Sequence, residues 1–122
     1  MKLIIAGSRN LNPSLGFIMS AIKMLDLLGP IAEIVSGGAC GVDAEGEHFA
    51  SHFGVPVKRF SADWDKHGKA AGPVRNRQMA EYADVLLLIW DGRSKGSANM
   101  REEMKRRDKP IYEVIVRNVL GI

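Results

Sequence analysis

The sequence predicts an α/β protein with one doubly wound, parallel sheet of about five strands and helices on both faces. Short, continuously apolar runs alternate with segments whose apolar residues recur at helical spacing, and small or polar turn residues separate the two. Continuous apolar runs are typical of parallel strands buried on both faces, and parallel strands need helical crossovers between them. The length of 122 residues fits a single domain, residues 1–122, without a linker.

Three strands and two helices are expected in the first half of the chain. The expected strands are residues 3–6, 31–35 and 55–60, and the expected helices are residues 15–28 and 43–53. Gly29 and Pro30 should end the first helix, because a glycine C-cap followed by proline is a common helix stop. Asp43 is expected to be the N-cap of the second helix. Pro56 cannot donate a ladder hydrogen bond, which favours an edge position for the third strand.

The second half is expected to add two strands and two helices. Residues 61–72 show no periodicity and are expected to form an irregular lid or binding loop. A helix should start near Pro73 and run to about Tyr82, before a strand at 85–90, a helix at 97–107 and a last strand at 111–116. The strand order 3-2-1-4-5 places the apolar strands one and four at the centre and the strand with Pro56 at an edge.

Small, polar or cationic turns follow the first, second and fourth expected strands. The strand order reverses between strands one and four, and α/β sheets bind ligands beyond the carboxyl ends of the strands at such a point. A glycine-rich turn before a helix exposes backbone N–H groups that suit a phosphate, although a tight turn without a ligand has the same pattern. The candidate ligand contacts in these turns are Gly7, Ser8, Arg9, Gly37, Gly38, Ala39, Cys40, Gly41, Asp91, Gly92, Ser94, Gly96 and Ser97.

Further candidate contacts lie outside these turns. Arg75 stands near the start of a helix and can hold a phosphate through two parallel hydrogen bonds. His67 and Lys69 precede it and favour an anion site over a merely solvated charged face. Trp64 can stack on a base or pin its loop to the core, and the second interpretation is favoured. Asp43 can bind a ribose hydroxyl while it caps its helix.

Composition and charge exclude several classes of protein. The net charge of +3 permits an anionic ligand but is too small for a protein that binds duplex DNA, and nucleic acid is not the expected partner. No apolar run approaches the roughly 20 residues of a membrane span. Cys40, the only cysteine, cannot form an internal disulfide, which indicates the cytoplasm. The chain is long enough to form a core without a metal, and neither a metal site nor a required cofactor is expected.

Five motifs together resemble the YspA-like branch of the SLOG superfamily. The most specific is GKAAGPVRNR at residues 68–77, which contains Arg75 and Asn76, and the other four lie at residues 7–9, 36–43, 62–64 and 90–100. The resemblance extends from Met1 to about residue 114. It implies a Rossmann-like fold and a nucleotide-derived ligand, either related to ADP-ribose and NAD or similar to a nucleoside monophosphate. It also adds Asn76 to the candidate contacts.

The resemblance extends to the LOG phosphoribohydrolases of the same superfamily, whose catalytic motif reads Pro-Gly-Gly-x-Gly-Thr-x-x-Glu. Gly96-Ser97 matches its Gly-Thr pair, but Met100 stands where the catalytic Glu belongs. A thioether cannot act as an acid or a base. An Arg four residues before a Met, a further feature of these enzymes, is matched by Arg75 and Met79.

Three functions remain open from the sequence. The favoured one is a sensor or sequestering protein that binds a nucleotide-derived signal without chemistry, because no acid or base stands out. The alternative is a hydrolase that cleaves an N-glycosidic or phosphate-linked bond with Asp43, Asp63 or Asp91. Single-stranded DNA binding comes third, by analogy with the DNA-processing relatives. Self-association into a homo-oligomer is also expected, because the helices after Asp43 and Pro73 carry the apolar residues Phe49, Phe53, Met79 and Tyr82.

Overall fold

The computed structural model of the chain describes residues 1–25 and 29–117 and contains one five-stranded sheet. All four neighbouring strand pairs are parallel, and the order is β3-β2-β1-β4-β5. The strands are β1 (Lys2–Gly7), β2 (Glu33–Ser36), β3 (Val57–Arg59), β4 (Val85–Trp90) and β5 (Ile111–Ile115). The predicted fold class and strand order are confirmed, and Pro56 lies directly before the edge strand β3.

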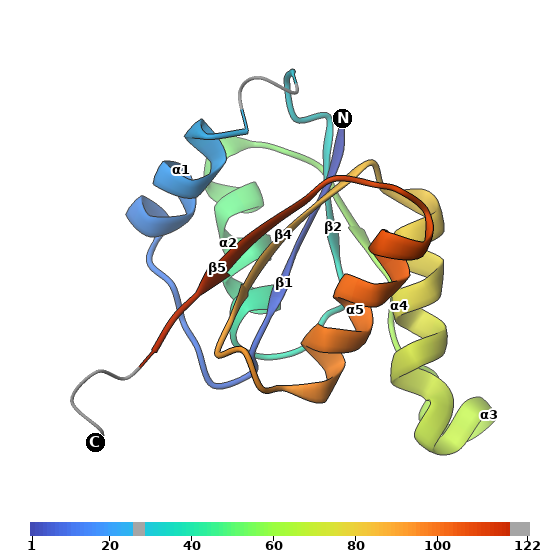
Figure 1. The fold of residues 1–122 in the computed structure, drawn as a ribbon. Coiled ribbons are helices and arrows are strands. Elements are labelled where there is room, and N and C mark those ends of the chain that lie inside the picture. Colours follow the sequence, from blue (N-terminus) through green and yellow to red (C-terminus); the bar gives the residue numbers. More distant parts are fainter. Residues whose placement is uncertain (26–28, 118–122) are drawn as a thin grey trace.

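Helices cover both faces of the sheet, as Figure 1 shows. Helices α1 (Leu15–Lys23) and α2 (Val42–Phe53) lie on one face, and α4 (Ala71–Tyr82) and α5 (Lys95–Arg106) lie on the other. A short helix α3 (Trp64–His67) and a 3-10 turn η2 (Gly68–Ala70) precede α4. None of the helices in the described part of the chain combines the length and the apolarity that crossing a membrane requires.

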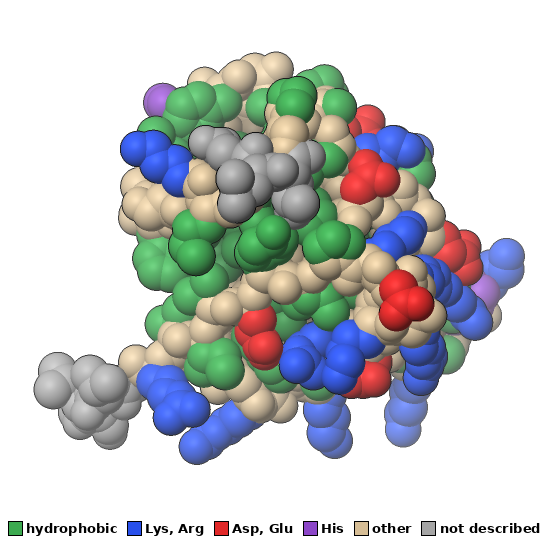
Figure 2. Space-filling view, turned by 45° about the horizontal axis from the view of Figure 1, so that its top comes forward, with side chains coloured by type: hydrophobic (Ala, Val, Ile, Leu, Met, Phe, Trp, Pro, Cys, Tyr) green, Lys and Arg blue, Asp and Glu red, His purple; other side chains and the backbone are tan. Residues whose placement is uncertain are grey.

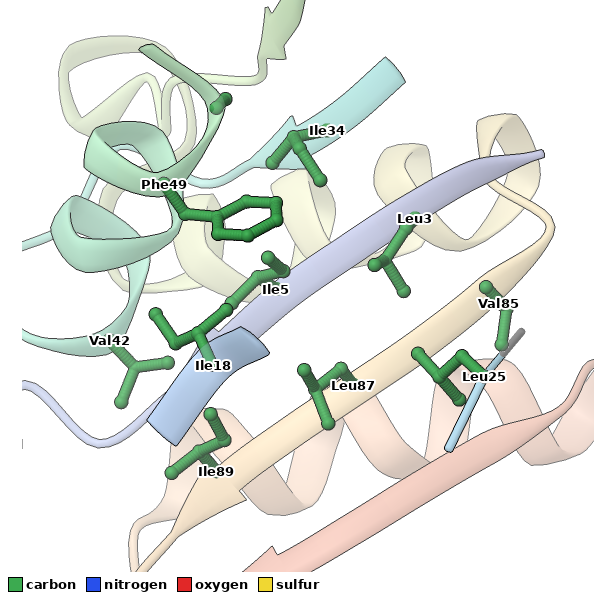
Figure 3. Packing of buried hydrophobic residues seen from close by; sticks show 11 residues of the cluster. Leu3, Ile5, Ile18, Leu25, Ile34, Val42, Phe49, Val85, Leu87 and Ile89 are labelled. Atoms are coloured by element: carbon green, nitrogen blue, oxygen red, sulfur yellow. The ribbon is translucent and has the colours of Figure 1, made fainter. Parts of the chain in front are cut away.

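Two hydrophobic cores, one on each face of the sheet, hold these layers together. Alternate residues of a strand point to opposite faces, so Leu3 and Ile5 pack against Ile18 and Phe49 of α1 and α2. Figure 3 shows this core between β1, β4 and the two helices. Ile4 packs instead in the second core, which lies under α4 and α5, together with the other strand residues that point to the same face of the sheet. All six residues of β4 are buried, in agreement with the apolar run that predicts a central strand.

Two predictions about helix ends are wrong. Helix α1 ends at Lys23 with Met24 as its C-cap, so Gly29 is not the residue that stops it. The predicted helix extended to residue 28, and residues 26–28 lie outside the described part of the chain. Gly41, with a φ of 78°, is the N-cap of α2 in place of Asp43. The sharp turn needs a positive φ at this position, which glycine adopts without strain.

The prediction of an irregular loop at residues 61–72 is also wrong. Most of this segment is helical, because α3, η2 and the first residues of α4 follow one another without a break. The Asp63 carboxylate accepts a hydrogen bond of 3.1 Å from the backbone N–H of Lys66 and so caps α3. A helix of four residues is too short to give an apolar periodicity, which is why the sequence pattern does not reveal it.

Candidate functional site

A crevice of about 330 Å³ lies at the carboxyl ends of β1, β2 and β4. It is located between β1 and β4, where the strand order reverses, as expected for a doubly wound sheet. Eleven of the predicted contacts line it, namely Gly7, Ser8, Arg9, Gly37, Ala39, Asp43, Arg75, Asn76, Ser94, Gly96 and Ser97. Four further lining residues were not among the predicted contacts, namely Ala6, Asn10, Met79 and Met100. Three of these four are apolar and belong to the second core or its edge.

A second cavity of about 280 Å³ adjoins the crevice and shares Arg9, Gly37, Ala39 and Arg75 with it. Three more predicted contacts, Gly38, Cys40 and Trp64, line this cavity together with Ser61 and Ala62. Trp64 is 54% exposed, so the favoured interpretation that it pins a loop to the core is wrong. The remaining predicted contacts, which line neither of these two cavities, are Gly41, His67, Lys69, Asp91 and Gly92.

Two of the three candidate catalytic carboxylates stabilise local turns. Asp63 caps α3, and the Asp91 carboxylate accepts hydrogen bonds from the backbone N–H groups of Arg93 and Ser94, at 2.8 and 2.9 Å. These two N–H groups hold the pKa of Asp91 below its ordinary value. Asp43 differs from both, because it lines the crevice and is buried.

Ser8 and two glycines join the three turns that form the crevice. The buried Ser8 donates its backbone N–H to Ile89 and accepts the N–H of Val42 at its carbonyl oxygen, while its hydroxyl oxygen accepts the N–H of Asp91. A Cβ at Gly7 would overlap the carbonyl oxygen of Ile89, and a Cβ at Gly41 would overlap the carbonyl oxygens of Ser8 and its neighbour Arg9. Backbone therefore packs directly on backbone, which fixes the three turns relative to one another.

A polar network outside the crevice holds the glycine turn after β2. The hydroxyl of Ser36 donates to Glu47 at 2.6 Å and accepts the backbone N–H of Gly38 at 3.0 Å. Arg59 of β3 donates two hydrogen bonds to the same Glu47 carboxylate. Although partial burial opposes ionisation of Glu47, the hydrogen bonds from Arg59 and Ser36 lower its pKa. The turn is thus anchored to both α2 and β3.

Asp43 is the one carboxylate among the described residues that line the crevice. Its side chain accepts the backbone N–H of Ala39 at 3.3 Å, and the residue is only 6% exposed. Burial raises the pKa of Asp43 to about 6, against the opposing effects of the Ala39 hydrogen bond and the charge of Arg75. A carboxyl group with such a pKa can gain or lose a proton close to neutral pH.

Arg75 connects α4 to the glycine turn. Its Nη1 donates to the carbonyl oxygen of Gly37 at 2.6 Å, and its Nε donates to the side-chain oxygen of Asn76 at 3.1 Å. The amide nitrogen of Asn76 in turn donates to the Gly96 carbonyl and to the Asn99 side chain, so the pair also reaches α5. Burial lowers the pKa of Arg75, with the Asp43 charge opposing it, but a guanidinium stays protonated at neutral pH.

The crevice has the electrostatic character of an anion site. Helices α2 and α5 both begin at it, and the N-terminus of a helix carries partial positive charge. Arg9 and Arg75 add two full charges to its wall, and Figure 2 shows Lys and Arg side chains projecting along the lower edge of the molecule. The hydroxyl oxygen of Ser94, the N-cap of α5, is buried and has no hydrogen-bond partner within the described residues.

Met100, which the motif resemblance aligns with the catalytic Glu of the LOG enzymes, lines the crevice. The nearby Glu103 is buried elsewhere and accepts hydrogen bonds from Arg106 and Arg107, so it cannot replace that Glu in the crevice. No group of three or more His, Cys, Asp or Glu side chains in residues 1–25 and 29–117 has the arrangement of a metal site.

Comparisons with known proteins agree with this fold. The DNA processing protein A (DprA) from Streptococcus pneumoniae, solved by X-ray crystallography, superimposes with a TM-score of 0.74 at 19% identity, over 98% of this chain and 52% of that one. The chain thus spans about half of that protein, and the likeness is one of fold. The Gene 61 protein of Mycobacterium phage D29 is 36% identical over 84 residues, which are 64% of this chain and 67% of that protein. The profile of the family described as "YspA, cpYpsA-related SLOG family" matches residues 1–67, and the chain belongs to this family.

Proposed function

We propose that the crevice binds an anionic, nucleotide-derived small molecule and that the protein acts as a sensor or a sequestering protein for it. The observation that carries this proposal is the position of the Arg75 guanidinium, held by the Gly37 carbonyl at the wall of a crevice where two helices begin. Helix N-termini and a fixed guanidinium together favour phosphate groups. The ligand classes that fit are relatives of ADP-ribose and NAD, and nucleoside monophosphates.

The remaining groups of the crevice suit a sugar. The buried Asp43 carboxylate is an acceptor for ribose hydroxyls, and the hydroxyls of Ser94 and Ser97 can donate or accept. A volume of about 330 Å³ is at the small end of ligand pockets, which matches the sugar-phosphate part of such a ligand. The exposed thiol of Cys40 is consistent with a reducing compartment, and we therefore also propose a cytoplasmic location.

Titration calorimetry on Arg75 variants tests the proposal. Arg75→Ala should weaken AMP or ADP-ribose binding by roughly 2–4 kcal/mol, since a phosphate loses a charged partner in a partly desolvated site. Arg75→Lys should recover part of this, because an ammonium cannot form two parallel hydrogen bonds. Arg77→Ala removes the same charge from an exposed position of the same helix and is the matched control.

Arg75 also contributes to the stability of the free protein. Because Arg75 donates to the Gly37 carbonyl, Arg75→Ala should lower the free energy of unfolding by about 1–2 kcal/mol without ligand. Thermal melts of each variant separate this effect from the loss of affinity. The proposal fails if no nucleotide derivative at millimolar concentration raises the melting temperature of the wild type, or if Arg75→Ala binds as tightly as the wild type.

A hydrolase is the second candidate, and the raised pKa of the buried Asp43 is the observation that favours it. A buried carboxyl with a pKa of about 6 can serve as a general acid or base near neutral pH. Asp63 and Asp91 suit this role less, because their carboxylates already accept backbone N–H groups in turns. Mass spectrometry after incubation with NAD, ADP-ribose and AMP distinguishes the two functions. New products that disappear in Asp43→Asn indicate catalysis, whereas recovery of intact ligand indicates binding alone.

Single-stranded DNA binding is a third candidate because DprA, which shares the fold, is named as a DNA processing protein. The basic side chains along one edge of the molecule would contact phosphates. Fluorescence anisotropy with a labelled oligonucleotide tests this. The apparent affinity should fall steeply with salt if several phosphates are bound, and no binding at low salt excludes this candidate.

A further inference from the structure

The second cavity contains the most exposed aromatic side chain near the site. Trp64 is 54% exposed and lines this cavity, whereas the other tryptophan, Trp90, is 7% exposed and belongs to the core. Large aromatic side chains account for much of the binding energy where they lie in a cavity. The proposed function makes no use of Trp64, because this residue does not line the crevice around Asp43.

The backbone that carries the indole belongs to a short, capped helix. Asp63 caps the short helix α3 that carries Trp64. On the other side lies Gly72 in the first turn of α4, where an added Cβ would be 3.8 Å from the Cη2 atom of the indole. One edge of the ring thus lies beside α4 while more than half of the residue stays open to solvent. A flat aromatic ring with this exposure can stack on a second flat ring.

The two cavities meet at charged residues. Arg9 and Arg75 line both of them, together with the backbone of Gly37 and Ala39. A ligand that extends from one cavity into the other must therefore pass two guanidinium groups. Phosphate is the linking group that guanidinium groups favour most strongly, and a diphosphate would match two of them.

We propose that Trp64 forms a second subsite that stacks on the heteroaromatic base of the ligand. The ligand is then a nucleoside diphosphate joined to a second sugar: its phosphates lie between Arg9 and Arg75, and the second sugar occupies the Asp43 crevice. This inference rests on the proposed function and narrows it, because it favours a diphosphate-linked molecule such as ADP-ribose over a nucleoside monophosphate. Every base has a flat ring that can stack, so the subsite should accept different bases rather than one particular base.

Paired probes with and without a base test this subsite. The probes are ADP-ribose and ribose 5-phosphate, measured by calorimetry against wild type, Trp64→Ala and Trp64→Phe. Trp64→Ala should weaken ADP-ribose roughly 5- to 150-fold, which corresponds to the usual contribution of one stacked base, and should leave ribose 5-phosphate unchanged. Trp64→Phe should recover part of the ADP-ribose affinity. Phe53→Ala, a similarly exposed aromatic at the far end of α2, is the control and should change neither.

Fluorescence provides an independent readout of the same contact. Stacking of a purine should quench the emission of Trp64, and the quenching should be absent in Trp64→Phe. The buried Trp90 supplies the background signal in both proteins. Quenching by ADP-ribose that persists in Trp64→Phe would contradict the proposal.

The possible outcomes separate the subsite from the proposed function. If the wild type binds neither probe, both proposals fall. If it binds ADP-ribose and Trp64→Ala binds equally well, only the subsite is refuted. Equal weakening of both probes in Trp64→Ala would mean that Trp64 acts through the fold, which also refutes the subsite. If Trp64→Ala loses the binding of a single-stranded oligonucleotide but binds ADP-ribose as tightly as the wild type, the ring contacts nucleic acid instead, and the subsite is refuted.

Discussion

Asp43→Asn is the substitution that tests the electrostatics of the site most directly. The asparagine has nearly the same shape as aspartate, can still accept the N–H of Ala39 through its side-chain oxygen, and resembles the protonated acid in carrying no charge. The variant therefore isolates the cost of placing a negative charge at this buried position. Glu103, which is also buried, does not allow such a comparison, because its carboxylate accepts hydrogen bonds from two arginines.

The magnitude follows from the two pKa values of Asp43. Its ordinary value is 3.8 and burial raises it to about 6, so the folded state binds the proton more tightly than the unfolded state. Stability must then fall as pH rises between these values and stay constant above about pH 7. A difference of about two units corresponds to about 3 kcal/mol at 1.36 kcal/mol per unit. Asp43→Asn should consequently be more stable than the wild type by about 1–3 kcal/mol at neutral pH, and about equally stable near pH 4.

Urea unfolding of both proteins between about pH 4 and 8 measures this difference. All other titrating groups are common to the two proteins and largely cancel in the comparison. Asp65→Asn removes a carboxylate from an exposed position of α3 and should give a difference that varies little with pH. A stability difference between wild type and Asp43→Asn that stays constant over this range would refute the assignment of a raised pKa. A loss of stability at neutral pH would show that the negative charge is instead stabilised by its surroundings.

Two further predictions concern the fold and the assembly. Gly7→Ala should lower the free energy of unfolding by more than about 4 kcal/mol and abolish cooperative melting, because the added Cβ would overlap the Ile89 carbonyl oxygen. Gly16→Ala is the control: the nearest atom to its added Cβ is 3.9 Å away, and the free energy of unfolding should rise by about 0.5–1 kcal/mol. We also expect a homo-oligomer, now through exposed apolar residues of α1 and the end of α2 such as Phe17 and Phe53, since the previously considered Phe49 and Met79 are buried in the cores. Light scattering at about 100 μM should give at least a dimeric mass that Phe53→Asp reduces, and a monomeric wild type would contradict this.

Most of the fold could be predicted from the sequence because buried parallel strands leave a strong signal. The run from Val85 to Trp90 has no polar residue and matches β4 residue for residue. Pro56, together with the more apolar strands one and four, placed the third strand at an edge. The errors lie where local signals are short or ambiguous. The four residues of α3 are too few to show a helical periodicity. Aspartate is a preferred N-cap residue, so Asp43 was expected at that position, but Gly41 occupies it.

The position of the site was predictable, but its internal chemistry was not. Turns after parallel strands converge at one edge of the sheet whatever their sequence, so Gly7, Gly37 and Gly96 could be grouped in advance. The hydrogen-bond partners that hold the glycine turn could not be predicted. Ser36, Glu47 and Arg59 come from three elements, and only the fold determines their register. The same holds for the raised pKa of Asp43, which depends on how deeply α2 packs against the sheet.

The methionine at position 100 bears on whether the crevice binds or cleaves its ligand. Hydrolysis of a glycosidic bond generally uses two carboxyl groups, one to protonate the leaving group and one to stabilise or attack the sugar. Among the described residues that line the crevice, Asp43 is the one carboxylate, and Met100 adds an apolar wall that is only 2% exposed. A single carboxyl with a pKa of about 6 can fill one of these roles at a time. It can also accept a ribose hydroxyl with no chemistry at all. The proposed binding needs one such carboxyl at most, whereas turnover generally needs two, and this difference is the reason to place binding before catalysis.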